Sequence, residues 1–155
     1  MSKAVVPHNA FIFVGDGRKA LFLRNEGDEK FANFVTEQVI VDDANPSTHE
    51  QGADKPGRGF AHAQGERRAA FETTDWHELE EHRFTQRVAQ ALEKVVRERH
   101  APALVIVAPP RALADLREAL HGDVRPLVRL EINKDLTKQP VWEIEKHVMA
   151  DAQAA

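Results

Sequence analysis

A chain of 155 residues with 42% hydrophobic and 30% charged residues is long enough to bury one core and too apolar to stay disordered. The absence of cysteine excludes disulfides, cysteine nucleophiles and thiolate metal sites, and a formal net charge of -4 argues against a wholly basic nucleic-acid binder. No apolar run is long enough to span a bilayer and no signal pattern begins the chain, so we expect a cytoplasmic protein without membrane contact.

The first third of the sequence predicts three antiparallel strands. The apolar run at residues 10–14 ends in Gly15-Asp16-Gly17, and residues 20–23 form a second apolar run directly after it, a pattern typical of a hairpin. A turn signal at residues 25–28 leads to residues 34–41, which are rich in β-branched side chains and favour a third strand. We therefore expect a meander.

Residues 42–74 show neither the strand period nor the helix period, and they predict a long flexible loop within a single domain of residues 1–155. From Lys55 to Arg68 the four cations Lys55, Arg58, Arg67 and Arg68 and the anion Glu66 give a formal charge of +3. Because the whole chain carries -4, the remainder must sum to -7. We expect residues 43–68 to be irregular and mobile in the free protein.

The second half alternates helices and strands. Apolar residues recur with the 3.6 period from Asp75 to about His100, which predicts a helix with Trp76 on its apolar face. The run at residues 104–107 lacks polar side chains and predicts a strand buried on both faces, and a helix with one apolar stripe begins at Pro110.

The last strand and the last helix complete this alternation. Residues 127–132 alternate apolar and polar side chains, as a strand exposed on one face does. A final helix is predicted from about Pro140, and both Trp76 and Trp142 are expected in the core.

The resulting order, β-β-β-α-β-α-β-α, predicts one α/β domain with a mixed sheet of about five strands, in the order of the ribonuclease H-like sheets. The runs at residues 10–14 and 104–107 are predicted to be central neighbours, because both are apolar without alternation. The carboxyl end of the second run, at residues 108–111, is where an open α/β sheet places a ligand crevice.

Four stretches, spread over nearly the whole chain, carry a resemblance to a known family. They are Gly15-Asp16-Gly17-Arg18-Lys19-Ala20, Pro56-Gly57-Arg58-Gly59-Phe60, residues 104–116, and Lys134-Asp135-Leu136-Thr137-Lys138 with Pro140 and Glu143. These motifs resemble the bacterial host attachment proteins, or proteins "required for attachment to host cells". The resemblance implies a fold related to the middle domain of the archaeal and eukaryotic release factors and of Pelota. The family name describes a phenotype and specifies no reaction.

The sequence lacks the residues of two catalytic sites that this resemblance brings into question. In release factors the corresponding loop carries Gly-Gly-Gln, whereas Gly57-Arg58-Gly59 is followed here by Phe60 and Ala61, so peptidyl-tRNA hydrolysis is not expected. Ribonuclease H-like nucleases need several carboxylates around metal ions. Asp16 follows the first strand, but no acid follows residues 104–107, and we interpret Asp16 as a turn residue.

Two groups of residues are candidates for binding. Arginines beside glycine backbone offer bidentate donors to phosphate, so the long loop predicts an anion-binding surface; a plain solvated loop is the alternative. The crevice residues follow the strand ends, although Arg111 could be an exposed first-turn residue and Asp135 could cap the turn into the last helix. The loop candidates are Lys55, Gly57, Arg58, Gly59, Gln64, Arg67 and Arg68, and the crevice candidates are Asp16, Arg111, Lys134 and Asp135.

No metal or cofactor site is predicted, because His49, His62, His77 and His82 have no diagnostic spacing. The first functional hypothesis is a translation-factor-derived module that contacts RNA, tRNA or the ribosome through the basic loop. The second is a small hydrolase acting on a phosphorylated or ester substrate in the crevice. The third is a protein-interaction domain. The sequence predicts neither a catalytic residue nor an oligomeric state.

Overall fold

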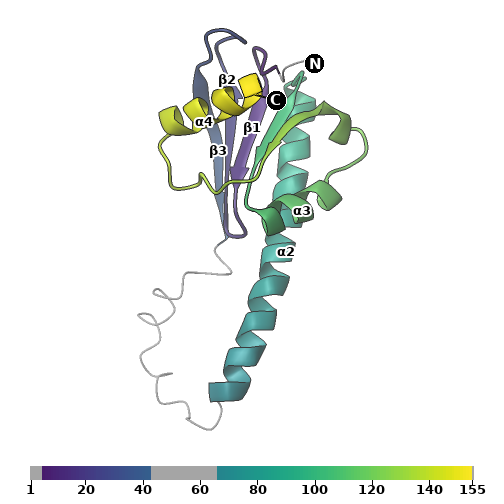
Figure 1. Cartoon of the computed structure of the whole chain (residues 1–155). Helices are drawn as coiled ribbons and strands as arrows, with labels where there is room; N and C mark the ends of the chain where they lie inside the picture. Colours follow the sequence, from purple (N-terminus) through teal and green to yellow (C-terminus); the bar gives the residue numbers. More distant parts are fainter. Residues whose placement is uncertain (1–4, 43–65, 155) are drawn as a thin grey trace.

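Five strands form one mixed sheet in the order β3-β2-β1-β4-β5 in the computed structural model, which describes residues 5–42 and 66–154 (Figure 1). The strands are β1 (Phe11–Gly15), β2 (Lys19–Asn25), β3 (Phe34–Val41), β4 (Leu104–Val107) and β5 (Val128–Ile132). The α-helices of the described residues are α2 (Glu66–Glu98), α3 (Pro110–Ala119) and α4 (Val141–Ala154). The chain is therefore an α/β protein, as the sequence predicts.

The two apolar runs form the middle of the sheet. β1 pairs in parallel with β4, with Phe11 opposite Leu104, and in antiparallel with β2. Every residue of β1 and β4 is buried, because helices cover both faces of these strands. The prediction that they are central neighbours is confirmed. β5 forms one edge of the sheet and has the alternating exposure that its sequence predicts.

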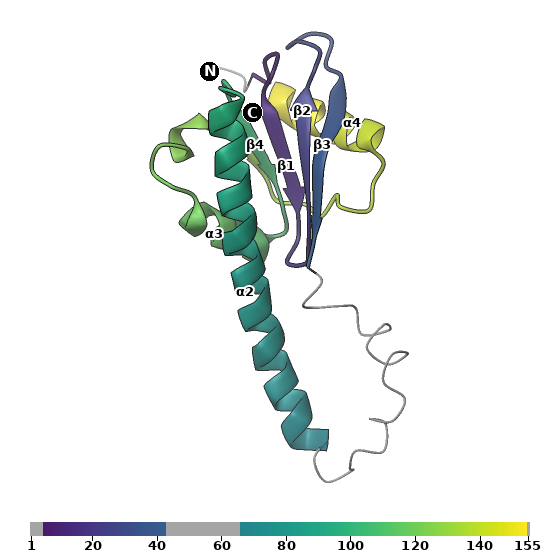
Figure 2. The ribbon, with the colours of Figure 1, turned by 180° about the vertical axis from the view of Figure 1, so that it is seen from behind.

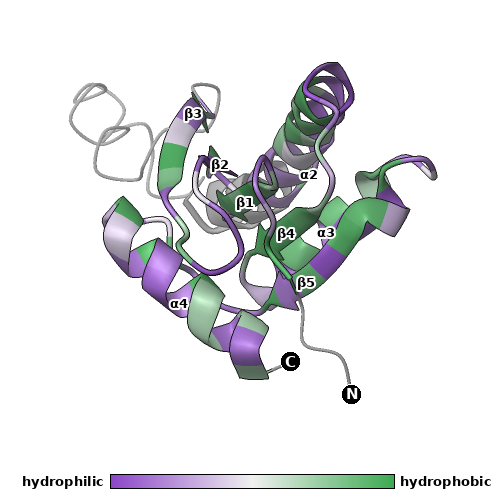
Figure 3. Ribbon diagram, turned by 90° about the horizontal axis from the view of Figure 1, so that it is seen from above, coloured by the Kyte–Doolittle hydropathy of each residue, from purple (hydrophilic) through white to green (hydrophobic). Residues whose placement is uncertain are grey.

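Helices on both faces divide the interior into two apolar cores. α2 and α3 lie on one side of the sheet and α4 on the other (Figure 3). Because side chains alternate along a strand, Phe11 and Phe13 of β1 face α2, while Ile12 and Val14 belong to the core beneath α4. Each face of the central strands is thus matched to its own helix layer.

Helix α2 begins at Glu66 rather than at Asp75, so the predicted loop is wrong over residues 66–74. These residues include alanine, glutamate and arginine, which favour helices, but they lack an apolar stripe. The stripe is missing because this part of α2 runs beyond the sheet and has no core to face (Figure 2). The predicted irregularity of residues 43–65 lies outside the described residues.

The same geometry explains why the two tryptophans are exposed rather than buried. Trp76, 42% exposed, comes before Glu81 on α2, in the part of the helix that extends past the sheet, and Trp142, 65% exposed, lies in the first turn of α4. The expectation that both rings enter the core is therefore wrong. In the described part of the chain, no helix combines the length and apolarity needed to cross a membrane.

An ion pair fixes the carboxyl end of α2 to the segment after α3. Arg97 donates from Nε and Nη2 to the two carboxylate oxygens of Asp123 at 2.8 and 2.7 Å. This bidentate contact lowers the pKa of Asp123 to about 2 and raises the pKa of Arg97. Glu93 of α2 also accepts the backbone N–H of His121 at 2.5 Å. The long helix is thus anchored at the end opposite to the part that projects.

Candidate functional site

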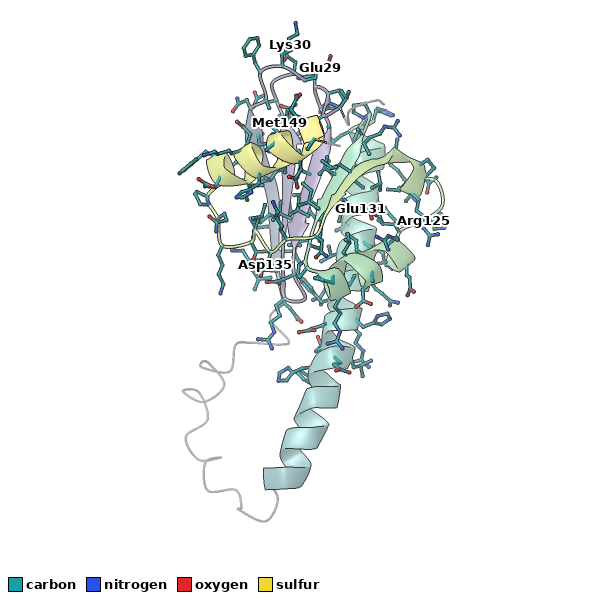
Figure 4. The ribbon with its side chains drawn as sticks, in the orientation of Figure 1. Glu29, Lys30, Arg125, Glu131, Asp135 and Met149 are labelled. Atoms are coloured by element: carbon teal, nitrogen blue, oxygen red, sulfur yellow. The ribbon has the colours of Figure 1, made fainter. Side chains whose placement is uncertain are left out.

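The parallel strands β1, β4 and β5 all have their carboxyl ends at the same end of the sheet, called here the carboxyl edge, which is distinct from the edge strands β3 and β5. This edge also carries the turn between β1 and β2, the start of α3, and the connection at residues 133–140 that leads to α4 (Figure 1). Asp135 lies in this connection and is seen at the same edge in Figure 4. The four crevice candidates follow the strands or begin α3 at this carboxyl edge of the sheet, which is where open α/β sheets bind their ligands.

Asp16 closes the turn between β1 and β2. Its Oδ1 accepts the backbone N–H of Arg18 at 2.7 Å and that of Lys19 at 2.8 Å, as the side chain of an aspartate turn does. This geometry agrees with the interpretation of Asp16 as a turn residue. Its second oxygen, Oδ2, lies 3.4 Å from the Thr137 hydroxyl, which links the turn to the connection after β5.

Thr137 is the centre of a short polar chain that the sequence did not single out as a site. Its hydroxyl lies 2.7 Å from Asp135 Oδ1, which also accepts the Thr137 backbone N–H at 3.1 Å. Thr137 is buried, and its single hydroxyl proton is donated to the nearer carboxylate, that of Asp135. Asp135 therefore closes its own turn, before α4 begins at Val141. The structure brings Asp16 and Asp135 together through Thr137.

The two crevice cations do not join this chain. Lys134 Nζ lies 3.8 Å from Asp151 Oδ2 on α4, whereas Arg111 Nη2 lies 3.4 Å from Glu78 Oε1 on α2. Because α4 and α2 cover opposite faces of the sheet, the cations are directed to opposite sides. The four crevice candidates thus do not form a single site.

A shallow depression lies between α2, α3 and the β1–β2 turn. It has a volume of about 190 Å³, and its lining includes Gly17, Glu81, Thr85, Arg111 and Asp115. A Cβ added at Gly17 would lie 2.8 Å from Cδ of Glu81, at the end of a flexible side chain that can move aside.

The chemistry of this depression is limited. Its volume is below the roughly 300 Å³ at which pockets for small molecules begin. Thr85 donates its hydroxyl to the Glu81 carbonyl at 2.9 Å, so this proton is already engaged. Arg111 is exposed and can meet a small anion, although Glu81 and Asp115 make the lining mixed in charge.

Of the basic-loop candidates, the structure places the backbone of Arg67 and Arg68 in the first turn of α2. Glu81 Oε2, further along this helix, lies 3.7 Å from Arg18 Nε and marks where α2 passes the edge of the sheet. The stretch from Arg68 to Glu81 spans about 20 Å at about 1.5 Å per residue, so α2 carries both arginines away from the body. The remaining candidates, Lys55, Gly57, Arg58, Gly59 and Gln64, lie outside the described residues.

Two of the four histidines considered as metal ligands, His77 and His82, lie on α2. His82 Nε2 lies 3.2 Å from Gln86 Nε2 one turn away. Within residues 5–42 and 66–154, no three histidine, aspartate or glutamate side chains are grouped in a way that could hold a metal ion. His49 and His62 lie outside these ranges.

Replacing Asp16 with asparagine is expected to change the free energy of unfolding by less than about 1 kcal/mol, because an asparagine oxygen can accept the same two N–H groups. Chemical denaturation measures this change, and Asp16→Ala, which removes the acceptor, should cost about 1–2 kcal/mol. A divalent-metal-dependent nuclease activity that is present in the unmodified protein and lost in Asp16→Asn would overturn the turn interpretation.

A mixed five-stranded sheet covered by helices on both faces defines an α/β protein. The chain belongs to the family described as "Protein required for attachment to host cells", whose family model matches residues 11–148. No curated protein matches the chain. The sequence-based assignment to the host attachment family is therefore confirmed.

Proposed function

We propose that this host attachment family protein is a translation-factor-derived module that contacts RNA or the ribosome in the cytoplasm through its basic segment, defined here as residues 55–68. The observation that carries the proposal is the separation of charge along the chain. The basic segment has a formal charge of +3, and the remaining residues sum to -7, which gives the total of -4. A polyanion is attracted to this segment. The acids that repel it flank the segment: residues 43–54 and 69–81 sum to -8, and the rest of the chain sums to +1.

The position of α2 supports this proposal. The basic segment follows β3 in the sequence, after residues 42–54, and it ends in the first turn of α2. Because α2 projects beyond the sheet, its first turn, to which Arg67 and Arg68 belong, stands away from the sheet and from the other helices (Figure 2). An RNA chain can therefore reach this turn without approaching Asp16 and Asp135 at the carboxyl edge of the sheet. The carboxylates nearest to the arginines in sequence belong to α2 itself, from Glu66 to Glu81.

The residues of the basic segment have distinct proposed roles. Arg58, Arg67 and Arg68 are proposed to donate to phosphate oxygens, which guanidinium groups bind bidentately. Gly57 and Gly59 would allow the backbone to approach the phosphates closely. We propose that this protein shares RNA binding, and not catalysis, with the release-factor middle domain. The catalytic Gly-Gly-Gln motif is missing, because Gly59 is followed by Phe60.

A hydrolase acting in the depression beside Arg111 is the alternative. The exposed Arg111 in a hollow at the carboxyl edge favours it, because such an arginine can meet a phosphate or carboxylate group. The small volume and the engaged Thr85 hydroxyl weigh against it. Under the binding proposal, Arg111→Ala leaves RNA affinity unchanged.

Labelled single-stranded RNA, titrated with the protein at several salt concentrations, tests the proposal. Each neutralised phosphate contributes about -0.7 to the slope of log affinity against log salt concentration. Replacing Arg58, Arg67 and Arg68 with alanine should therefore reduce the magnitude of the slope by about 2 and weaken binding at low salt. An unchanged slope and affinity would eliminate the basic segment as the contact surface.

The matched control removes three exposed cations from the body of the protein. Lys30, Lys94 and Lys146 lie on the β2–β3 turn, on α2 near its carboxyl end and on α4, and all three are exposed. Their replacement with alanine changes the net charge as much as the arginine variant does. We expect the control to retain the full slope, and a loss equal to that of the arginine variant would indicate a general effect of net charge.

A further inference from the structure

The two edge strands of the sheet differ in how they are protected against pairing with another strand. β5 has five residues, and its Glu131 is paired with Arg117 at 2.5 Å. β3 has eight residues, and Glu37 is its only charged side chain. Glu37 is directed inward, where it binds Arg24 at 3.2 Å and also Arg99. In the part of the chain that the structure describes, charge therefore protects β5, whereas the outer side of β3 pairs with no strand and carries no charge over residues 39–41.

The outer half of β3 is apolar as well as uncharged. Val39 and Val41 are 49% and 54% exposed, which is unusual for two valines on one strand. Val39 is opposite Leu21, whose side chain packs against the core under α4, so both valines lie on the α4 face. The neighbouring Ile40 is half-buried on the other face.

Hydrogen bonding shows which backbone groups of β3 are available. The N–H of Asp42 donates to the carbonyl of Arg18, the residue before β2, at 2.8 Å. Because hydrogen-bonded and non-hydrogen-bonded pairs alternate in an antiparallel ladder, Asp42 and Ile40 turn their N–H and C=O groups toward β2. Val39 and Val41 turn theirs away from the sheet. The same two residues thus present both apolar side chains and outward backbone groups.

We propose that β3 is the interface of a two-fold symmetric homodimer, in which two copies of the strand pair antiparallel and join the sheets. The two-fold axis passes between the Ile40 residues of the two copies. Val39 of each copy is then opposite Val41 of the other. This register forms four backbone hydrogen bonds and gathers four valines on the α4 faces.

A second copy fits this edge because the edge is complementary to itself. Residues 39–41 bring no charge to the interface, so two-fold pairing sets no like charges against each other. In the two-fold register each copy supplies the same two valines and the same outward backbone groups, so each group meets its counterpart. The proposal does not depend on RNA binding, which concerns a different segment.

Cysteine crosslinking tests the register directly, because the chain contains no cysteine. In Ile40→Cys the two thiols face each other across the axis, with Cα atoms about 4.5 Å apart, which suits a disulfide. We expect this variant to form a covalent dimer under mild oxidation. Val39→Cys should not crosslink, because its counterpart is displaced by two residues along the strand.

Leu130→Cys is the matched control, since Leu130 is half-buried in the middle of the other edge strand. It should remain monomeric on non-reducing gels. Crosslinking of Ile40→Cys no greater than that of Leu130→Cys, or crosslinking of Val39→Cys in its place, would overturn the proposed pairing.

Sedimentation gives a second test that does not depend on a substitution at Ile40. The unmodified protein should approach twice its chain mass of 17.4 kDa as its concentration rises from about 1 µM to about 500 µM. Replacing Val39 and Val41 with lysine should yield monomers at every concentration, and at about 1 µM, where the unmodified protein is also monomeric, the thermal midpoints of the two proteins should agree. A monomeric unmodified protein, or a dimeric lysine variant, would contradict the proposal.

Discussion

Replacing Phe84 with alanine is expected to lower the free energy of unfolding by about 3–5 kcal/mol. Phe84 is 1% exposed and is one of the largest fully buried side chains of the protein. It projects from α2 into the core formed with β1, β2 and α3, and its ring also contacts the guanidinium of Arg87 at 5.4 Å from the ring centre. Truncation would leave a cavity under the long helix that the rigid strands cannot fill.

The control for this substitution is Phe31→Ala. Phe31 lies in the turn between β2 and β3 and is 79% exposed, so its removal should change stability by less than about 0.5 kcal/mol. Denaturation by urea, followed by circular dichroism, measures both changes. Equal effects of the two substitutions would contradict the docking of α2 on the sheet.

Replacing Asn25 with alanine should cost about 3 kcal/mol, although asparagine is not an apolar core residue. Asn25 is buried at the end of β2, where its Nδ2 donates to the carbonyls of Val6, Pro7 and Asp28 at 3.0, 3.3 and 3.2 Å. Its Oδ1 accepts the N–H groups of Gly27 and Asn33, both at 3.0 Å. The two N–H groups and the carbonyl oxygen of this side chain thus lie within hydrogen-bond distance of five backbone groups, with one N–H shared between two carbonyls, and alanine would remove these partners.

Asn133→Ala provides the comparison for Asn25, because Asn133 is exposed after β5. We expect it to change the free energy of unfolding by less than about 0.5 kcal/mol. If Asn25→Ala lowered the free energy of unfolding as little as Asn133→Ala does, water would be able to replace the Asn25 amide without loss of stability.

The central strands could be predicted because their burial leaves a local signature. Residues of β1 and β4 are apolar without alternation, and only strands covered on both faces need that composition. The alternating pattern of β5 likewise indicated a strand with one exposed face. The mixed sheet therefore follows from patterns that each strand carries within itself.

The start of α2 and the exposure of the tryptophans could not be found in this way. Apolar periodicity detects a helix only where one face of it meets a core, and α2 runs past the sheet before Glu81. Trp76 and Trp142 match helical stripes in sequence, but the sheet ends before it can cover them. The high helix propensity of residues 66–72 was the one sequence feature that could have placed the start of the helix at Glu66.

The candidate site was predictable in part. Asp16 between two glycines indicated a turn, and its bonds to the N–H groups of Arg18 and Lys19 agree with that interpretation. The directions of Arg111 and Lys134 depend on Glu78 and Asp151, which are distant in sequence and unmarked by any motif. The role of Thr137 likewise arises from contacts made only after β1 and β5 are side by side with β4.

Sedimentation of the purified protein with purified ribosomes at low salt tests the proposed function most directly. The proposal predicts that the unmodified protein and the Lys30, Lys94 and Lys146 alanine variant pellet with ribosomes and are released as salt is raised. The Arg58, Arg67 and Arg68 alanine variant should stay in the supernatant while keeping its thermal midpoint. Failure of the unmodified protein to pellet with ribosomes or to bind free RNA, or pelleting of all three proteins alike, would contradict a contact through the basic segment.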